Sequence, residues 1–132
     1  MSTNPTSPDE VVTSFIQAIE RLDLDAACEL LADDVIYDNV PIGAVQGPEG
    51  VRSTLGDFFG ASEVDWPVAR QTATGNVVMN ERLDRFKLDT GWLELPVVGV
   101  FEVEDALITL WRDYFDLGTF RSALKALNDT NG

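Results

Sequence analysis

The chain has 132 residues and a formal net charge of −14, from 23 acidic and 9 basic residues. This length fits one domain, and the acidic balance argues against nucleic acid or an anionic membrane as a partner, because phosphate groups are bound by basic patches. Histidine is absent, which excludes Ser-His-Asp and Cys-His catalysis as well as zinc bound by histidine.

The cysteine content favours a reducing, cytoplasmic location. Cys28 is the single cysteine of the chain, so an intrachain disulfide is impossible. It stands in an apolar helical pattern, where we expect a small core residue rather than a nucleophile. The sequence shows neither a basic-then-apolar N-terminal signal nor an apolar run long enough to span a bilayer. We therefore expect no membrane partner.

The first half of the chain predicts three helices and a strand. Residues 1–6 are polar and are expected to be disordered, ahead of one domain over residues 7–132. Ser7, with Pro8 and Glu10 behind it, is typical of a helix start with a capping box. The apolar spacing then predicts elements that follow in this order: a helix to about Leu22, a short helix over 25–32, a strand over 35–40 that Pro41 stops, a loop over 41–47, and a helix from Pro48 with the stripe Val51, Leu55, Phe58 and Phe59 and a C-cap at Gly60.

The second half of the chain predicts a β-meander followed by a helix. Short turns at 75–76, 90–91 and 104–105 imply antiparallel hairpins. The expected elements are strands over 66–74, 77–88, 92–103 and 107–115 and a closing helix over 117–127. The sequence therefore predicts an α+β domain whose helices cover one face of a curved sheet.

Charged residues stand in an otherwise apolar row of the strand 77–88. Side chains alternate between the two faces of a strand, so Arg82 and Asp84 share a face with Val78, Asn80 and Phe86. A buried charge is costly unless it is paired, and these two residues can pair with each other. The alternative is an exposed ion pair on a solvated face.

Two further strands carry polar groups in comparable positions. Asp113 lies in an apolar row of the strand 107–115, and Tyr37 and Asn39 share a face of the strand 35–40. The alternative for Asp113 is a solvent-facing position with Arg112 as its partner. If all three faces look inward, one pocket holds two carboxylates, a guanidinium, a phenol and a carboxamide. This set suits acid–base chemistry on an uncharged apolar substrate, with one carboxylate as base and the other, protonated, as acid.

Four segments resemble the limonene-1,2-epoxide hydrolase family. They are Tyr37-Asp38-Asn39, the stretch Asn80 to Phe86, the stretch Leu95 to Val103, and Trp111-Arg112-Asp113-Tyr114-Phe115-Asp116. The resemblance covers nearly the whole chain after the first few residues. An Arg-x-Asp pair alone is weak evidence, whereas its combination with Trp-Arg-Asp-Tyr-Phe and Tyr-x-Asn at these separations is specific.

The resemblance implies a fold, an assembly and a set of roles. The fold is the cone shared with ketosteroid isomerase and nuclear transport factor 2, a curved mixed sheet wrapped by helices around a deep apolar pocket. Members are usually homodimers and open epoxides with water in one step, without cofactor or metal. Carried over by position, Asp113 is the base, Tyr37 and Asn39 share its water, Asp84 is the acid, and Arg82 bridges the carboxylates.

The apolar residues near this set suggest the substrate. A pocket lined by Phe86, Trp111, Phe115 and Phe120 would accept a cyclic, terpene-like or aryl-substituted epoxide. Two other functions stay open at this point. One is proton shuttling of the ketosteroid isomerase type, with Tyr37 and Asp84 as an oxyanion hole. The other is binding of an apolar ligand without catalysis, since this fold hosts both activities.

Overall fold

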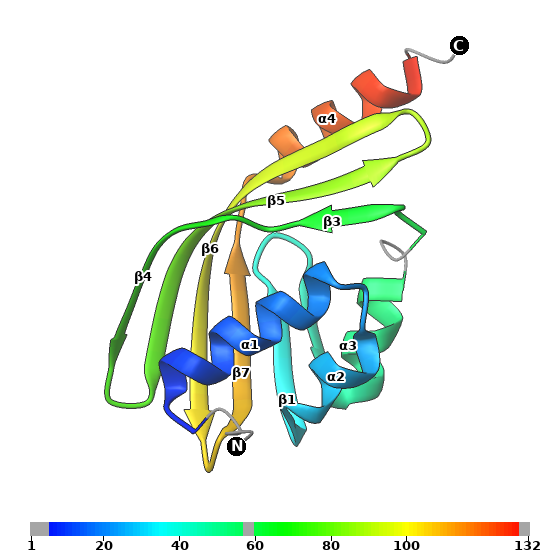
Figure 1. The fold of residues 1–132 in the computed structure, drawn as a ribbon. Helices are drawn as coiled ribbons and strands as arrows, with labels where there is room; N and C mark the ends of the chain where they lie inside the picture. The colour runs from blue at the N-terminus through cyan, green and yellow to red at the C-terminus, as the bar shows by residue number, and fades with distance from the viewer. Residues whose placement is uncertain (1–5, 57–59, 130–132) are drawn as a thin grey trace.

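In the computed structural model, the described residues, 6–56 and 60–129, form one curved sheet with helices beside it (Figure 1). The strand order is β2-β1-β7-β6-β5-β3, and β4 also pairs with β5. The helices are α1 (Pro8–Glu20), α2 (Leu24–Glu29), α3 (Gly47–Gly56) and α4 (Leu117–Asp129), and the strands are β1 (Leu31–Asn39), β2 (Gly43–Gln46), β3 (Glu63–Asp65), β4 (Val68–Thr74), β5 (Val77–Leu88), β6 (Gly91–Glu104) and β7 (Leu107–Tyr114).

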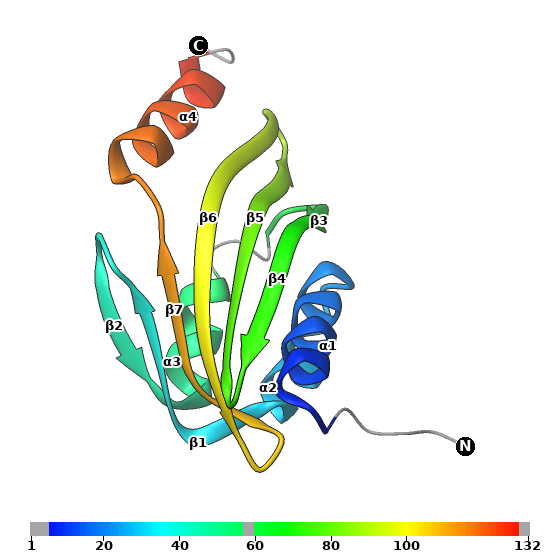
Figure 2. The same cartoon turned by 90° about the vertical axis from the view of Figure 1, so that its left-hand side faces the viewer.

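The meander β4–β7 is antiparallel, as its short turns predict. Strand β5 pairs with β6 along its whole length, from Val77 opposite Glu102 to Leu88 opposite Gly91. Strand β1, in contrast, pairs in parallel with the edge of β7 that faces away from β6, as Figure 2 shows. The sheet is therefore mixed and stays open, and the predicted α+β class with a curved mixed sheet is confirmed.

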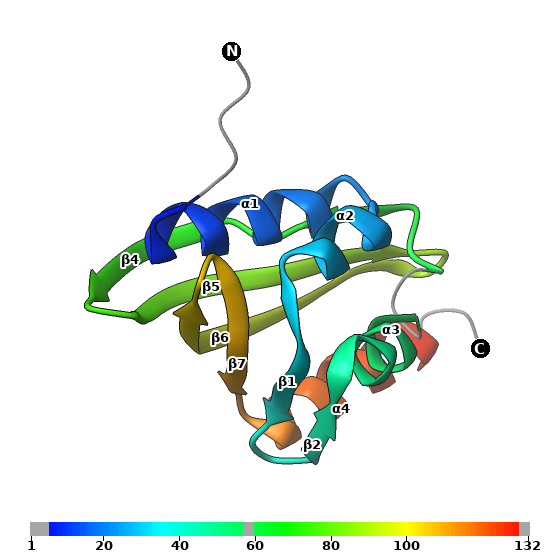
Figure 3. The ribbon, with the colours of Figure 1, turned by 90° about the horizontal axis from the view of Figure 1, so that it is seen from below.

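Helix α1 covers one face of the sheet, as the view from below shows (Figure 3). The predicted capping box is confirmed, because the Ser7 side chain accepts from the Glu10 backbone and Glu10 reaches back to Ser7. The apolar stripe of α1 is buried against the sheet and consists of Val11, Val12, Phe15, Ile16, Ala18 and Ile19. Helix α4 lies at the far end of β5 and β6 and packs on β6 (Figure 1).

Several predicted boundaries are wrong. The strand expected over 35–40 begins at Leu31 and ends at Asn39. The loop expected over 41–47 contains the edge strand β2, which pairs with β1. The strand expected over 66–74 begins only at Val68, as β4, because Pro67 has no N–H to donate to a ladder, and the sequence did not predict the short strand β3 that precedes it on the same edge of β5. The second helix ends at Glu29 rather than residue 32, because Leu31 already pairs with Ile108 of β7.

Some sequence-based expectations fall outside the described residues. This holds for Phe58 and Phe59 and for the expected disordered N-terminus, of which only Thr6 is described, without regular secondary structure. The described part of α3 ends at Gly56. Across residues 6–56 and 60–129, we find no helix whose length and apolar character would let it cross a membrane.

Candidate active site

The inward face of β5 carries the charged residues of the site. The alternating burial along this strand is as predicted, with Val78, Asn80, Arg82, Asp84 and Phe86 all buried. The side chain of Arg82 is 0% exposed and that of Asp84 is 6% exposed, which excludes the alternative of an exposed ion pair. A buried pair of this kind requires good geometry to offset the loss of hydration.

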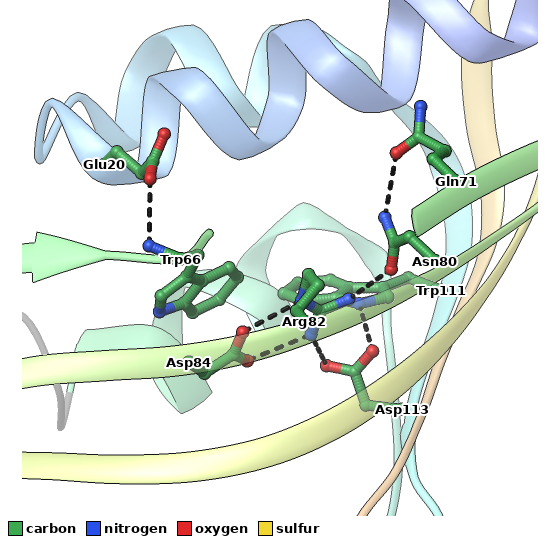
Figure 4. A network of polar contacts seen from close by, with 8 residues as sticks. All are labelled: Glu20, Trp66, Gln71, Asn80, Arg82, Asp84, Trp111 and Asp113. Carbon is green, nitrogen blue, oxygen red and sulfur yellow. Dashed lines mark hydrogen bonds and ion pairs between the residues drawn. The ribbon is translucent and has the colours of Figure 1, made fainter. Parts of the chain in front are cut away.

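Arg82 bridges two carboxylates that lie on different strands (Figure 4). Its Nε and Nη2 donate to the two oxygens of Asp84, each at 2.9 Å, in a bidentate arrangement. Nη2 also donates to Oδ2 of Asp113 at 2.9 Å. The guanidinium is planar and its donors have a fixed geometry. The distance and orientation of the two carboxyl groups are therefore set by one rigid group.

Asp113 reaches this cluster from β7 and is held there by a second donor. Nε1 of Trp111 donates to Asp113 Oδ1 at 2.9 Å. The alternative in which Arg112 pairs with Asp113 is excluded, because Arg112 Nε donates instead to Asp38 at 2.9 Å. The predicted face holds for Trp111 and Asp113, but Leu107 of the same row is exposed, because the pairing of β6 with β7 shifts register at Glu102/Val103.

Tyr37 and Asn39 come to the site through the parallel pairing of β1 with β7. Tyr37 is opposite Trp111 and Asn39 is opposite Asp113 in the register. The Tyr37 ring stacks on the Trp111 indole, with ring centroids 3.8 Å apart and an interplanar angle of 9°. Both Tyr37 and Asn39 line the same cavity as Asp84 and Asp113. The structure thus brings together all five polar residues that the sequence singled out.

Gly99 of β6 leaves the space in which the cluster forms. It lies opposite Asn80 on one side and Asp113 on the other. A Cβ atom added there would be 2.9 Å from Oδ1 of both Asn80 and Asp113 and closer still to Nη1 of Arg82. A side chain at this position would displace the polar groups, so the cluster depends on a glycine between its two strands.

Burial and charge set the protonation of three groups in the site. Burial lowers the pKa of Arg82, but the charges of Asp113 and Asp84 more than offset this, so the net shift is upward and the cation is retained. Burial raises the pKa of Asp84 to about 6, against the opposing effect of Arg82. Burial also raises the pKa of Tyr37. A carboxyl group that keeps its proton up to about pH 6 and a protonated phenol are both available as donors.

A cavity of about 430 Å³ opens in front of the two carboxylates. Three of the four aromatic residues predicted to bind substrate line it, namely Phe86, Phe115 and Phe120. Trp111 is fully buried and is not among the lining residues, because its indole lies against Tyr37 and its N–H is directed to Asp113. The other lining residues are Tyr37, Asn39, Ile42, Gly43, Ala44, Val45, Thr54, Leu55, Trp66, Asp84, Leu95, Val97 and Asp113.

Trp66 is a wall residue that the sequence reasoning missed. It follows β3 and immediately precedes Pro67, where the edge of the sheet is interrupted and the β4–β5 register shifts. Such irregularities re-aim side chains. The Cζ atom of Arg82 lies 5.2 Å from the Trp66 ring centroid, a cation–π contact. The Trp-Pro pair was the available signal for this break.

In the described part of the chain, no three His, Cys, Asp or Glu residues gather where they could hold a metal.

This geometry agrees with the result of comparisons with known proteins. The model of the limonene-1,2-epoxide hydrolase catalytic domain matches residues 6–126. The chain belongs to this family. Family membership confirms the prediction of an epoxide hydrolase, and the match includes every polar residue of the cluster described above.

Individual relatives support the same assignment. The chain is 34% identical over 117 residues to the epoxide hydrolase EphG of Mycobacterium tuberculosis, a match that covers 88% of this chain and 78% of EphG. A solved structure of an epoxide hydrolase from M. tuberculosis that resembles the limonene-1,2-epoxide hydrolases is 32% identical, with a TM-score of 0.79 and 90% of each chain covered. An NTF2-like protein from Cytophaga hutchinsonii is 21% identical, with a TM-score of 0.72 over 88% of this chain and 95% of its own, and shows the fold alone.

Proposed function

We propose that this protein hydrolyses a neutral, apolar epoxide to a vicinal diol in one step, without a covalent intermediate. The observation that carries the proposal is the pair of buried carboxylates bridged by Arg82 at the wall of an apolar cavity. The pair supplies a base and an acid at a fixed separation. An epoxide needs both, because water must lose a proton while the ring oxygen gains one.

The roles follow from the surroundings of each group. Asp113 acts as the base, and Tyr37 and Asn39, its neighbours in the β1–β7 register, hold the attacking water. Asp84 acts as the acid, since burial raises its pKa to about 6 and it lines the cavity. Arg82 keeps both carboxyl groups in place. A charged guanidinium between them also stabilises whichever carboxyl group is ionised.

The proposed step balances in atoms and protons. The water oxygen bonds to one epoxide carbon while the bond from that carbon to the ring oxygen breaks. Asp113 takes a proton from the water, and Asp84 gives its proton to the oxygen of the opened ring. One water is consumed, and the two carboxyl groups have exchanged protonation states. A proton then passes from Asp113 to Asp84 through solvent before the next turnover.

The cavity supports the choice of an apolar substrate. Its aromatic wall is formed by Phe86, Phe115 and Phe120, with Trp66 beside them. The Arg82 side chain, by contrast, is completely buried behind the carboxylates, so it offers no contact to an anionic group of a substrate. We propose a cyclic or terpene-like epoxide that packs on these rings. Trp111 contributes indirectly by holding Asp113.

The outer face of the sheet supports a homodimer. Val98 lies between Glu81 and Tyr114 on neighbouring strands. Val98, Tyr114 and Met79 are each about half exposed, which is unusual for apolar residues gathered on one face. We propose that a second copy covers this face. The dimer would dissociate in Val98→Glu, as measured by light scattering, whereas a wild-type chain that stays monomeric at high concentration would contradict the proposal.

The single buried cysteine and the acidic charge further support a cytoplasmic enzyme without a nucleic-acid partner.

One experiment tests both the activity and its mechanism. A panel of terpene, cycloalkene and styrene oxides is first screened for diol formation, which separates hydrolysis from isomerisation or mere binding. A single turnover is then run in ¹⁸O-labelled water with enzyme in excess over the best epoxide. One-step attack gives a diol labelled in the first turnover. An unlabelled diol would mean that a carboxylate oxygen was transferred, and the one-step mechanism would have to be abandoned.

A further inference from the structure

Arg82 has a third side-chain partner that the reaction described above does not use. Its Nη1 donates to Oδ1 of Asn80 at 3.0 Å. Asn80 lies two residues before Arg82 on the same inward face of β5 and is almost completely buried. It is not among the residues that line the cavity, so its side chain acts on the site through Arg82.

The orientation of the Asn80 amide is fixed by a chain of hydrogen bonds that ends outside the site. Nδ2 of Asn80 donates to Oε1 of Gln71 at 3.1 Å. Nε2 of Gln71 donates in turn to Asp9 Oδ1 at 2.7 Å and to Thr13 Oγ1 at 3.1 Å, both on α1. Figure 4 shows the contact between Gln71 and Asn80 and its continuation to Arg82.

The order of donors and acceptors in this chain of hydrogen bonds is fixed because the chain begins at the carboxylate of Asp9. An ionised carboxylate only accepts hydrogen bonds, and the Gln71 amide accordingly presents its NH₂ group to Asp9. The Gln71 oxygen then faces Asn80 and requires the NH₂ group of Asn80. The remaining oxygen of Asn80 is thereby presented to Arg82, which has only donors to offer. If the Asn80 amide were reversed, an NH₂ group would face the cation.

We infer that Asn80, oriented by Gln71 and Asp9, is a positioning residue that fixes the Arg82 guanidinium between Asp84 and Asp113. The inference rests on the proposed function in so far as it concerns turnover. Nη1 of Arg82 donates to neither carboxylate. Its hydrogen bond to Asn80 therefore holds the part of the guanidinium that Asp84 and Asp113 leave free. Without this acceptor, a donor of a buried cation is left unsatisfied.

The test is a double-mutant cycle on kcat with Asn80→Leu and Gln71→Leu. Asn80→Leu is expected to lower kcat roughly ten- to hundredfold, the range for loss of a hydrogen bond to a charged group, with KM changed by less than about twofold. Gln71→Leu is expected to lower kcat by roughly threefold to tenfold, as for one neutral hydrogen bond. Because both act through the same contact, the double variant should be no slower than Asn80→Leu.

The matched control is Val78→Ala. Val78 lies on the same strand and the same inward face, is completely buried and has no polar group. Its truncation should lower the unfolding temperature while kcat stays within about twofold of wild type. An Asn80→Leu variant that folds and keeps the wild-type kcat would overturn the inference, as would additive effects in the cycle. If Asn80→Leu does not fold, an unchanged kcat in Gln71→Leu would overturn it equally.

A second readout does not require turnover. Rotation of the Arg82 guanidinium about its Cζ–Nε bond is measured by ¹⁵N NMR, with the signals assigned by their loss in Arg82→Lys. We expect slow rotation in wild type and in Val78→Ala and faster rotation in Asn80→Leu. Equal rates in all three proteins would refute the role of Asn80. An enzyme that turned over no epoxide would refute the proposed function instead and would leave this measurement decisive for Asn80.

Discussion

The raised pKa of Asp84 has a consequence for folding stability that can be measured without a substrate. Burial raises this pKa from 3.8 to about 6 in the folded chain, so the folded state holds a proton that the unfolded state has already released. Between these two pH values the folded state binds more protons, and stability therefore falls as pH rises. The stabilisation is fully present below about pH 4 and is lost above about pH 6.

The size of the effect follows from the shift. One pKa unit corresponds to about 1.4 kcal/mol, so the shift of Asp84 from 3.8 to about 6 is equivalent to about 3 kcal/mol. Asp84→Asn removes the titrating group. The stability difference between variant and wild type should therefore change by about 3 kcal/mol from pH 4 to pH 8, in favour of the variant at the higher pH.

Urea unfolding followed by tryptophan fluorescence measures this difference at half-unit pH steps. Comparing the two proteins at each pH cancels the contribution of the carboxylates that do not interact with Asp84, which is why the difference is informative and the absolute curves are not. Parallel curves for wild type and Asp84→Asn would show that Asp84 binds its proton equally in both states. The assignment of Asp84 as a carboxyl group that keeps its proton up to about pH 6 would then be wrong.

Further outcomes are expected from the site. If Asp84 is the acid, kcat falls about tenfold per pH unit above about pH 6, and a flat pH profile through pH 9 would contradict this. Asp113→Asn should lower kcat by roughly 10²- to 10⁴-fold while circular dichroism stays unchanged. Gly99→Ala should cost roughly a hundredfold in kcat, since the added Cβ displaces Arg82 and its partners; wild-type turnover would show that the cluster can adjust. Tyr37→Phe should lower kcat about threefold to tenfold and Asn39→Ala more strongly, and the reverse order would change the assignment of the water's partners.

The central strand of the site was predictable from the sequence because its pattern is regular. The expected strand 77–88 has the bounds of β5, and its alternation correctly placed Asn80, Arg82 and Asp84 on one buried face. The alternation failed toward the start of β7, where Leu107 is exposed, because a register shift changes which residues face inward. Side-chain alternation predicts the buried face only where the strand pairing continues without a bulge or register shift.

Other features depend on contacts that the sequence does not display. The edge strand β2 is short, and only its pairing with β1 identifies it. The sequence pattern predicts Trp111 among the substrate-binding rings because it is aromatic, whereas its hydrogen bond to Asp113 is visible only in the structure. The alternation predicts the buried face of Asn80 but not its role. That role depends on its hydrogen bond to Gln71, which in turn contacts α1, and both lie far from Asn80 or outside its strand.

The parallel pairing of β1 with β7 also joins parts of the site that lie far apart along the chain. Arg82, Asp84 and Asp113 come from strands of the β5–β7 meander, which follow one another along the chain as hairpins with local contacts. Strand β1 pairs across a long interval, as the sequence separation of 74 between Asp38 and Arg112 illustrates. Closing so long a loop costs more entropy and slows folding. A chain with the meander formed and β1 undocked would hold both carboxylates and Arg82 without Tyr37 and Asn39, so we expect the part of the cavity wall that these two residues form to be completed late in folding.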